Sequence, residues 1–252
     1  MIMRIQYISD IHIETMNTRK FKLICEKISP KCETLILAGD IGNPMFSTQH
    51  YQYFLDSMSK KFKKVFLVSG NHEYYGNDIV KTDEHISDVC KTRPNISFLN
   101  NSTELYNGFR FIGSTQWTKI DEPRFLCNDF TYISNMSITR YNDLHNISRI
   151  FLKKEIKDAK INHEKSIVIT HHLPLHELTH NKYKNPSMSR YNQCFSSDMT
   201  DVFENGNTIK SWIYGHTHTK SVQNKFEIPF LCNPLGYDGE NDDPEINITF
   251  DV

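Results

Sequence analysis

TLILAGD, residues 34–40, is the stretch that decides the fold. Its first five residues are apolar almost throughout, and they run directly into Gly39-Asp40. Strands that are buried on both faces of a covered sheet have this near-continuous apolar character. A carboxylate that follows such a strand lies at the carboxyl end of the sheet, where open α/β proteins collect their ligands.

The same pattern recurs along the chain, because other short apolar runs end in clusters of Gly, Asp or His. These runs are RIQYIS (4–9), KVFLVS (64–69), FRFIG (109–113), SIVIT (166–170) and SWIY (211–214). Between the strands, the residue spacing favours helices at 17–29, 48–60, 78–91 and 143–160. Two segments resemble further strands (94–107 and 226–252), and two are long polar loops (118–142 and 176–196). Repeated strand, ligand loop and helix predict an α/β fold.

Five of the segments at strand ends contain residues that bind metals. They are SDIH (9–12), GDIGN (39–43), GNHE (70–73), THH (170–172) and GHTH (215–218), and they offer Asp10, His12, Asp40, Asn71, His171, His216 and His218. Carboxylate, imidazole and amide oxygen ligands suit Mn, Fe or Zn better than a soft thiolate site does. Seven ligands suffice for two ions if one carboxylate bridges them, and Asp40 is our candidate for the bridge. Two-metal sites serve displacement at phosphorus.

Each of these signals has a structural alternative when it is taken alone. Asp40 is equally typical of a helix N-cap or a turn. Asn71 follows Gly70 and suits a left-handed backbone conformation. His72 cannot easily share the direction of Asn71, so we expect it to face the substrate; alternatively, it is a buried histidine paired with Glu73.

Three further residues are candidates for substrate contact. His171 and His172 are adjacent, so one is expected to bind metal while the other contacts substrate or supports the site. Arg190 offers a bidentate contact to phosphate, or is a surface arginine. Trp117 offers a ring for stacking on a base, or packs in the core.

Composition limits the class of protein. The chain has 252 residues, of which 38% are hydrophobic, as expected for a single domain spanning 1–252. Lysine and arginine number 29 and aspartate and glutamate 30, so the net charge of −1 gives no strong nucleic-acid footprint. Six scattered cysteines indicate reduced thiols. Neither a signal peptide nor an apolar run of about 20 residues is apparent, so we expect a soluble, cytoplasmic protein without a membrane partner.

The five motifs in this order resemble the calcineurin-like metallophosphoesterase superfamily. Its pattern is D-x-H, G-D, G-N-H-[DE], a histidine after a strand, and G-H-x-H, and every block is present here. The stretches GSTQW (113–117), SRYNQCFSSDM (189–199) and CNPLGYDGE (232–240) are similar to a subgroup of small bacterial-type predicted phosphoesterases. The resemblance implies a four-layer α-β-β-α sandwich of two mixed β-sheets flanked by helices.

The resemblance also implies roles for individual residues. The first of two divalent ions, Mn²⁺ before Fe or Zn, would be held by Asp10, His12, Asp40 and His218. The second would be held by Asp40, Asn71, His171 and His216. His72 matches the catalytic histidine, and His171 is preferred to His172 as the ligand because it directly follows the strand.

The expected activity is hydrolysis of a small phosphodiester or phosphomonoester, possibly nucleotide-like, by a metal-bridging hydroxide. In this scheme His72 stabilises the phosphoryl oxygens and protonates the leaving group. Two alternatives stay open: a metal-dependent nuclease acting on short oligonucleotides, and a binding scaffold that has lost catalysis. A protein serine/threonine phosphatase ranks lower, because no Arg follows the G-D and G-N-H blocks.

Overall fold

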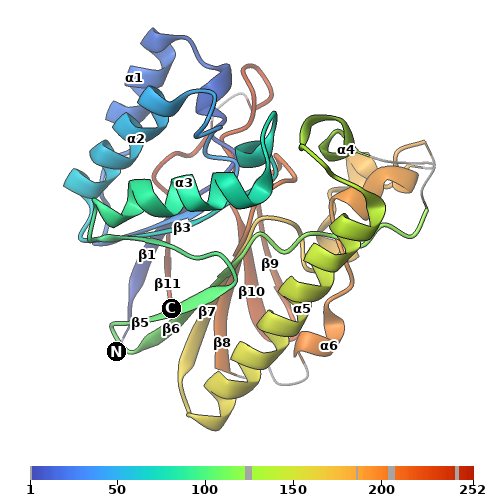
Figure 1. Ribbon diagram of the computed structural model, residues 1–252. Coiled ribbons are helices and arrows are strands. Elements are labelled where there is room, and N and C mark those ends of the chain that lie inside the picture. The colour runs from blue at the N-terminus through green and yellow to red at the C-terminus, as the bar shows by residue number, and fades with distance from the viewer. Residues whose placement is uncertain (1, 123–126, 186, 204–207, 242–243) are drawn as a thin grey trace.

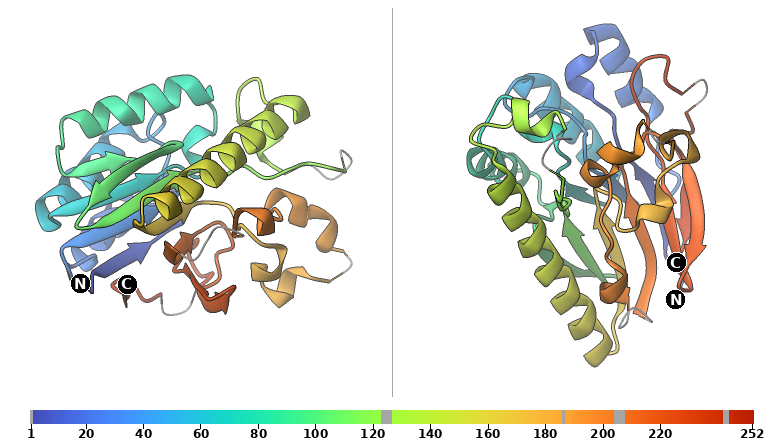
Figure 2. Two further views of the ribbon diagram at one scale, coloured as in Figure 1. Left: turned by 90° about the horizontal axis from the view of Figure 1, so that it is seen from below. Right: turned by 90° about the vertical axis from the view of Figure 1, so that its right-hand side faces the viewer.

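The protein forms two mixed β-sheets that pack face to face between two layers of helices. The computed structural model describes residues 2–122, 127–185, 187–203, 208–241 and 244–252. Helices α1, α2 and α3 cover one sheet, and α5 and α6 cover the other (Figures 1 and 2). The predicted four-layer sandwich is therefore confirmed.

The first sheet has the order β11-β1-β2-β3-β4, and all of its neighbours are parallel except β11. Its strands are β1 (Arg4–Ile8), β2 (Thr34–Ala38), β3 (Lys64–Val68), β4 (Ile96–Phe98) and β11 (Thr249–Asp251). The second sheet has the order β5-β6-β7-β8-β10-β9, with antiparallel strands at its two edges. Its strands are β5 (Ser102–Tyr106), β6 (Phe109–Ser114), β7 (Lys165–Thr170), β8 (Ile209–Tyr214), β9 (Ser221–Lys225) and β10 (Ile228–Cys232).

The helices lie between these strands in the chain. Their bounds are α1 (Thr18–Lys27), α2 (Thr48–Lys61), α3 (Ile79–Lys91), α4 (Asp129–Tyr132), α5 (Ile138–Ile161) and α6 (Thr200–Phe203). Among the described residues, no helix combines the length and the apolar character that crossing a bilayer requires.

The two sheets divide most of the apolar core into three layers, and a fourth cluster lies around Trp117 and Tyr141. In β2, Leu35 and Leu37 point to the helices while Ile36 and Ala38 point to the other sheet. This alternation is the period-two geometry of a strand with two buried faces. Between the sheets, the rings of Phe66 and Phe111 stack with centroids 3.8 Å apart. The middle layer thus fixes the two sheets against each other.

The strand register places the ligand loops side by side. Ala38 at the end of β2 pairs with Val68 at the end of β3, and Ile8 of β1 pairs with Leu37. The loops that follow therefore start at the same level. Backbone hydrogen bonds continue this alignment beyond the strands, from Asp10 N to Gly39 O at 3.0 Å and from His12 N to Asp40 O at 3.0 Å.

The largest differences from the sequence-based predictions concern three parts of the chain. Helix α5 starts at Ile138 rather than 143, because Ser137 caps it by accepting a hydrogen bond from Arg140 N. Segment 94–107 divides into β4 and β5, which belong to different sheets. Strand β9 was not predicted, since it is a polar edge strand with no buried residue. The predicted segments 118–142, 176–196 and 226–252 each include residues outside the described ranges.

Candidate metal centre

All seven predicted ligands lie together at the carboxyl ends of the strands. The two chain termini lie near each other at the start of β1, in the left half of Figure 1. They form two sets. In the first, ligand atoms of Asp10, His12, Asp40 and His218 all lie within 4.8 Å of one another. His218 Nε2 is 3.0 Å from His12 Nε2 and 3.4 Å from Asp10 Oδ1. His12 Nε2 is 3.8 Å from Asp40 Oδ2.

The second set shares Asp40 with the first. It contains Asp40, His171 and His216, and Asn71 adds an amide oxygen. His171 Nε2 lies 3.3 Å from Asp40 Oδ2, 3.1 Å from Asn71 Oδ1 and 3.1 Å from His216 Nδ1. The far nitrogen of His171 lies 3.1 Å from the carbonyl of Ala38, to which it donates. This hydrogen bond turns Nε2 toward the other ligands.

Hydrogen bonds to the Nδ1 atoms of His12 and His218 also orient the first set. His12 Nδ1 faces Glu14 at 3.3 Å, and His218 Nδ1 faces Glu240 at 2.6 Å. Because each carboxylate accepts a hydrogen from Nδ1, the Nε2 atoms of both rings point at the shared space. Carboxylate–histidine pairs fix metal-binding imidazoles in this way. Two Nε2 atoms 3.0 Å apart need a proton or a cation between them, so the residues present fit a metal ion.

Metal binding is expected to strengthen as the pH rises. Burial lowers the pKa of His218, but Asp10 and Glu240 outweigh it and raise the pKa to about 9. For His171, Asp40 and Asp10 outweigh burial and also raise the pKa to about 9. Near neutral pH each imidazole holds an extra proton that a cation must displace.

The affinity for each ion should therefore fall roughly tenfold per unit below about pH 9, with about one proton released per ion. Calorimetric titration in buffers of different ionisation enthalpy measures both quantities. An affinity that stays constant between about pH 7 and pH 9 would contradict this expectation.

Most of the ligands have an unusual backbone conformation. Five of them have a positive φ, which non-glycine residues rarely adopt: Asp10 (52°), His12 (52°), Asp40 (51°), His216 (67°) and His218 (48°). Such conformations cost about 1–3 kcal/mol each and persist where the surrounding structure determines them. At Gly70, a methyl group would overlap Asp40 Oδ1, which explains the glycine before Asn71. The surrounding structure thus determines the conformation of the ligand loops.

Glu73 holds two of these loops. Its buried carboxylate accepts from the backbone nitrogens of Asp40 (3.0 Å), Ile41 (2.8 Å), Gly42 (3.3 Å) and Gly70 (2.7 Å). It therefore binds the loop after β2 to the loop after β3. The suggested pairing of Glu73 with His72 is not observed, because the carboxylate is turned to these backbone groups.

His72 lies beside the centre, apart from the two sets that share Asp40. Its backbone nitrogen donates to Asp40 Oδ1 at 2.8 Å, and its Nδ1 lies 3.2 Å from Glu14 Oε1. Its Nε2 lies 3.2 Å from the hydroxyl of Tyr237. Burial lowers the pKa of His72, but Asp40 and Glu14 outweigh it and raise the pKa above its usual value. His12, Glu14 and His72 also form a third cluster of potential ligands.

Asp129 at the start of α4 orients Asn71. Its Oδ1 accepts from Asn71 Nδ2 at 2.8 Å and from the hydroxyl of Tyr75 at 2.8 Å. Its Oδ2 accepts from the hydroxyl of Tyr141 at 3.2 Å and from the thiol of Cys127 at 3.4 Å. With its amide nitrogen held, Asn71 presents its carbonyl oxygen to the second set.

Replacing Asp129 by alanine is expected to weaken ion binding at the second set ten- to a hundredfold, the usual effect of removing such a supporting residue. Asp129→Asn should restore most of the affinity, since its oxygen still accepts from Asn71 and the hydroxyls can turn to accept from its nitrogen. A two-step metal titration separates the two sites. Equal weakening of both sites, or no rescue by asparagine, would argue against this role. The surface variant Asp56→Ala serves as the control.

A pocket of about 230 Å³ opens at the centre. Residues of the segments that follow the strands line it: Asp40, Asn71, His72, His216 and His218. Four aromatic side chains form its rim: Tyr75, Tyr183, Phe195 and Tyr237. The pocket thus combines potential metal ligands with the surfaces of aromatic rings.

The three candidates for substrate contact are not among the described residues that line this pocket. His172 is fully buried behind His216, with ring centroids 4.4 Å apart, so its position does not favour substrate contact. Trp117 is 3% exposed and packs against Tyr74 and Tyr141, which fits the core-packing alternative. Arg190 is exposed in the 3₁₀ helix Ser189–Cys194, with its guanidinium over the ring of Tyr191.

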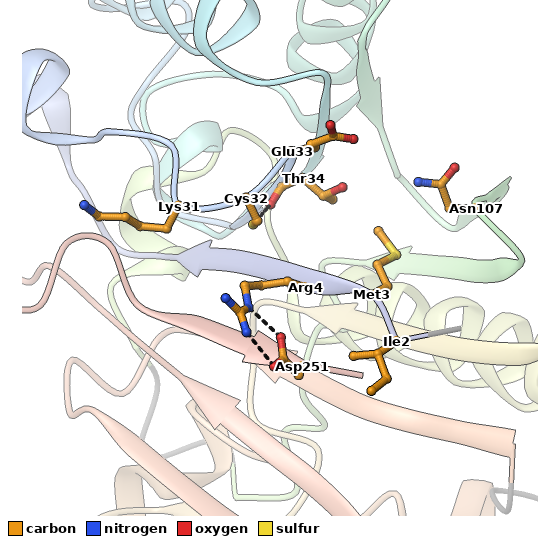
Figure 3. A pocket seen from close by; sticks show the side chains of 9 residues that line it. All are labelled: Ile2, Met3, Arg4, Lys31, Cys32, Glu33, Thr34, Asn107 and Asp251. Carbon is orange, nitrogen blue, oxygen red and sulfur yellow. Dashed lines mark hydrogen bonds and ion pairs between the residues drawn. The ribbon is translucent and has the colours of Figure 1, made fainter.

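A larger hollow of about 560 Å³ lies at the opposite end of the strands (Figure 3). The start of β1 and the residues before β2 line it. Arg4 lines the hollow, and its guanidinium pairs with both carboxylate oxygens of Asp251 at 2.7 and 2.8 Å. The length of β1 separates this hollow from the metal-ligand sets, so it is not part of the candidate centre.

Sequence patterns did not reveal several residues that shape the centre: Glu14, Tyr75, Asp129 and Glu240. Glu14 carried a weak signal, since it stands two residues after His12 in the first motif. Asp129 and Glu240 lie in polar segments without a spacing that points to the site. The stretch CNPLGYDGE also offers Asn233, Tyr237 and Asp238 as residues of the rim, and of these Tyr237 lines the pocket.

Comparisons with known proteins agree with this geometry. A family model described as calcineurin-like phosphoesterase matches residues 3–220. The chain is 30% identical over 270 residues to L509 of Acanthamoeba polyphaga mimivirus, an alignment that covers 94% of this chain and 92% of L509.

Two solved structures share the fold. Phosphopantetheinyl hydrolase from Mycobacterium tuberculosis superposes with a TM-score of 0.72 at 16% identity, over 94% of this chain and 90% of that one. A dimetal phosphatase from Danio rerio superposes with a TM-score of 0.61 at 11% identity, over 91% and 86% of the two chains.

Proposed function

The chain belongs to the calcineurin-like phosphoesterase family, and from this premise we propose that it hydrolyses a small phosphodiester at a centre of two divalent ions. The observation that carries the proposal is Asp40, which belongs to both ligand sets and thus stands where a bridging carboxylate would. No other group of residues in the described part of the chain brings together as many ligands of the kind that divalent ions prefer.

Each set would hold one ion. The first comprises Asp10, His12, Asp40 and His218, and the second comprises Asp40, Asn71, His171 and His216. Mn²⁺ is our first choice, and Fe or Zn suit the same donors. Bound ions of this kind polarise phosphoryl oxygens and lower the pKa of water to about 7, which supplies hydroxide near neutral pH.

The protein's own contribution is positioning and proton supply. The ligand loops fix the place of the reacting phosphorus, since their backbone is already set. His72 reaches the same pocket from beside Asp40. Its raised pKa increases the fraction of imidazolium near neutral pH, so Nε2 can donate to the leaving oxygen. Glu14 on Nδ1 keeps the ring turned this way.

The aromatic rim favours a diester over a monoester. Tyr237 stands against His12 on the side of the first set, with ring centroids 4.5 Å apart. Phe195 stands against His216 on the side of the second set, with centroids 4.7 Å apart, and Tyr183 stacks on Phe195. A diester has two substituents, and the pocket offers an aromatic surface for each. The same surfaces suit nucleotide bases, so short oligonucleotides are the second candidate substrate.

Hydrolysis of bis-p-nitrophenyl phosphate and of p-nitrophenyl phosphate tests the proposal. The protein is stripped of metal, and Mn²⁺ is then returned. Mn-dependent cleavage that favours the diester is expected. Preference for the monoester would overturn the diesterase assignment but retain a phosphatase. A protein that binds two ions and cleaves neither ester would instead support the scaffold alternative.

A further inference from the structure

The loop after β10 places Tyr237 at the candidate metal centre. Leu235 N donates to Ser9 O at 3.0 Å, and Gly236 N donates to Asp10 O at 2.9 Å. Gly236 has a φ of 76°, which lets the chain turn sharply before Tyr237. These residues follow position 220, where the match to the family model ends. The family comparison therefore assigns them no role.

Tyr237 covers the first ligand set. Its ring stacks on His12 at 4.5 Å and meets the edge of His218 at 4.8 Å. The backbone nitrogen of Tyr237 donates to Glu240, whose carboxylate also binds His218 Nδ1. The ring is thus fixed by the same loop that orients a ligand histidine.

The hydroxyl of Tyr237 points into the pocket. It lies 3.2 Å from His72 Nε2, and Tyr237 and His72 both line the pocket. On its other side, His72 is held by Glu14. Glu14, His72 and Tyr237 therefore form a line of hydrogen bonds that ends in a phenol at the pocket surface.

A packing role alone does not require this hydroxyl. A phenylalanine ring would stack on His12 equally well, whereas the oxygen adds a donor beside the proposed catalytic imidazole. A phenol hydrogen rotates about its C–O bond, so it can point to an anionic oxygen placed nearby while the phenol oxygen accepts from His72 Nε2. Fixed donors aimed at a phosphoryl group stabilise the charge that develops on it.

We propose that the Tyr237 hydroxyl donates a hydrogen bond to a phosphoryl oxygen of the substrate, as a second donor beside His72. This inference rests on the proposed function. It makes Tyr237 a catalytic residue supplied from outside the family motifs, and it places the phosphoryl group between Tyr237, His72 and the ligand sets.

The test compares wild type with Tyr237→Phe, which keeps the ring and removes the hydroxyl. Binding of inorganic phosphate to the Mn²⁺-loaded protein is measured by calorimetry, together with metal content and kcat/KM for bis-p-nitrophenyl phosphate. We expect two ions in both proteins, phosphate binding weakened about tenfold, and kcat/KM lowered about ten- to a hundredfold. Tyr53→Phe is the control, since Tyr53 is an exposed tyrosine on α2 outside the pocket.

Two results would overturn the role of Tyr237. Unchanged phosphate affinity in Tyr237→Phe would mean that the hydroxyl is not a donor, even if Tyr237→Ala is impaired. Loss of an ion from Tyr237→Phe would mean that the residue acts on the metal site instead.

Failure of the proposed function gives a different result. A wild type that binds two ions and phosphate without cleaving either ester removes the activity but still lets phosphate titration decide the role of Tyr237. A wild type that binds neither ions nor phosphate and cleaves neither ester overturns both proposals.

Discussion

Replacing Asp40 by alanine is expected to remove both metal ions and to lower phosphodiester hydrolysis at least about a thousandfold. Asp40 Oδ2 lies 3.3 Å from His171 Nε2 and 3.8 Å from His12 Nε2, so the carboxylate faces both sets at once. Without Asp40, the second set keeps only the neutral ligands Asn71, His171 and His216, and the first set keeps a single carboxylate, Asp10. Metal analysis after dialysis against Mn²⁺ and steady-state kinetics measure the two effects.

Two matched variants make the Asp40 experiment decisive. Asp40→Asn keeps the size of the side chain and an oxygen able to accept from His72 N, so a similar loss would assign the effect to charge. Asp56→Ala removes a surface aspartate that pairs with Arg93, and it should retain both ions and full activity. Retention of two ions by Asp40→Ala would rule out the bridging role.

Replacing His72 by alanine should lower kcat by about a hundred- to ten-thousandfold while both ions stay bound. The contact that His72 makes with Asp40 comes from its backbone nitrogen, which alanine retains. The lost imidazole removes a donor from the pocket, and this is the usual magnitude for a general acid. Metal content and single-turnover kinetics give the two readouts.

The third cluster of His12, Glu14 and His72 means that the His72→Ala variant also tests whether His72 is a metal ligand. If these residues held an ion, His72→Ala would lose metal, and His72 would be a ligand rather than a proton donor. His180→Ala is the control, because His180 lies exposed in a loop outside the pocket. Normal kcat in His72→Ala would remove the histidine from the mechanism.

Much of the fold and of the ligand sets was predictable because the signals are local. TLILA and KVFLV are apolar at every position after the first, so their sequences specify strands buried on both faces. Parallel strands end at a common edge, and therefore residues directly after them, such as Asp40 and Asn71, were expected to meet. The choice of His171 over His172 came from the family resemblance, and the structure brings His171 into the second set.

Contacts between distant segments were decided by the tertiary structure alone. Whether Trp117 faces a ligand or the core depends on its packing against Tyr141, and a single polar loop does not encode that packing. The support of Asn71 by Asp129 joins residues 58 positions apart. The approach of Tyr237 to His72 joins residues 165 positions apart.

The sequence by itself thus determined which side chains could bind metal and which strands would present them, because strand burial and residue type are read position by position. The division of the ligands around Asp40 was expected from the family resemblance, whereas only the tertiary structure decided which carboxylates turn each imidazole. Those arrangements depend on the register of two sheets and on loops that pack across them, and such long-range geometry leaves no periodic trace in the chain.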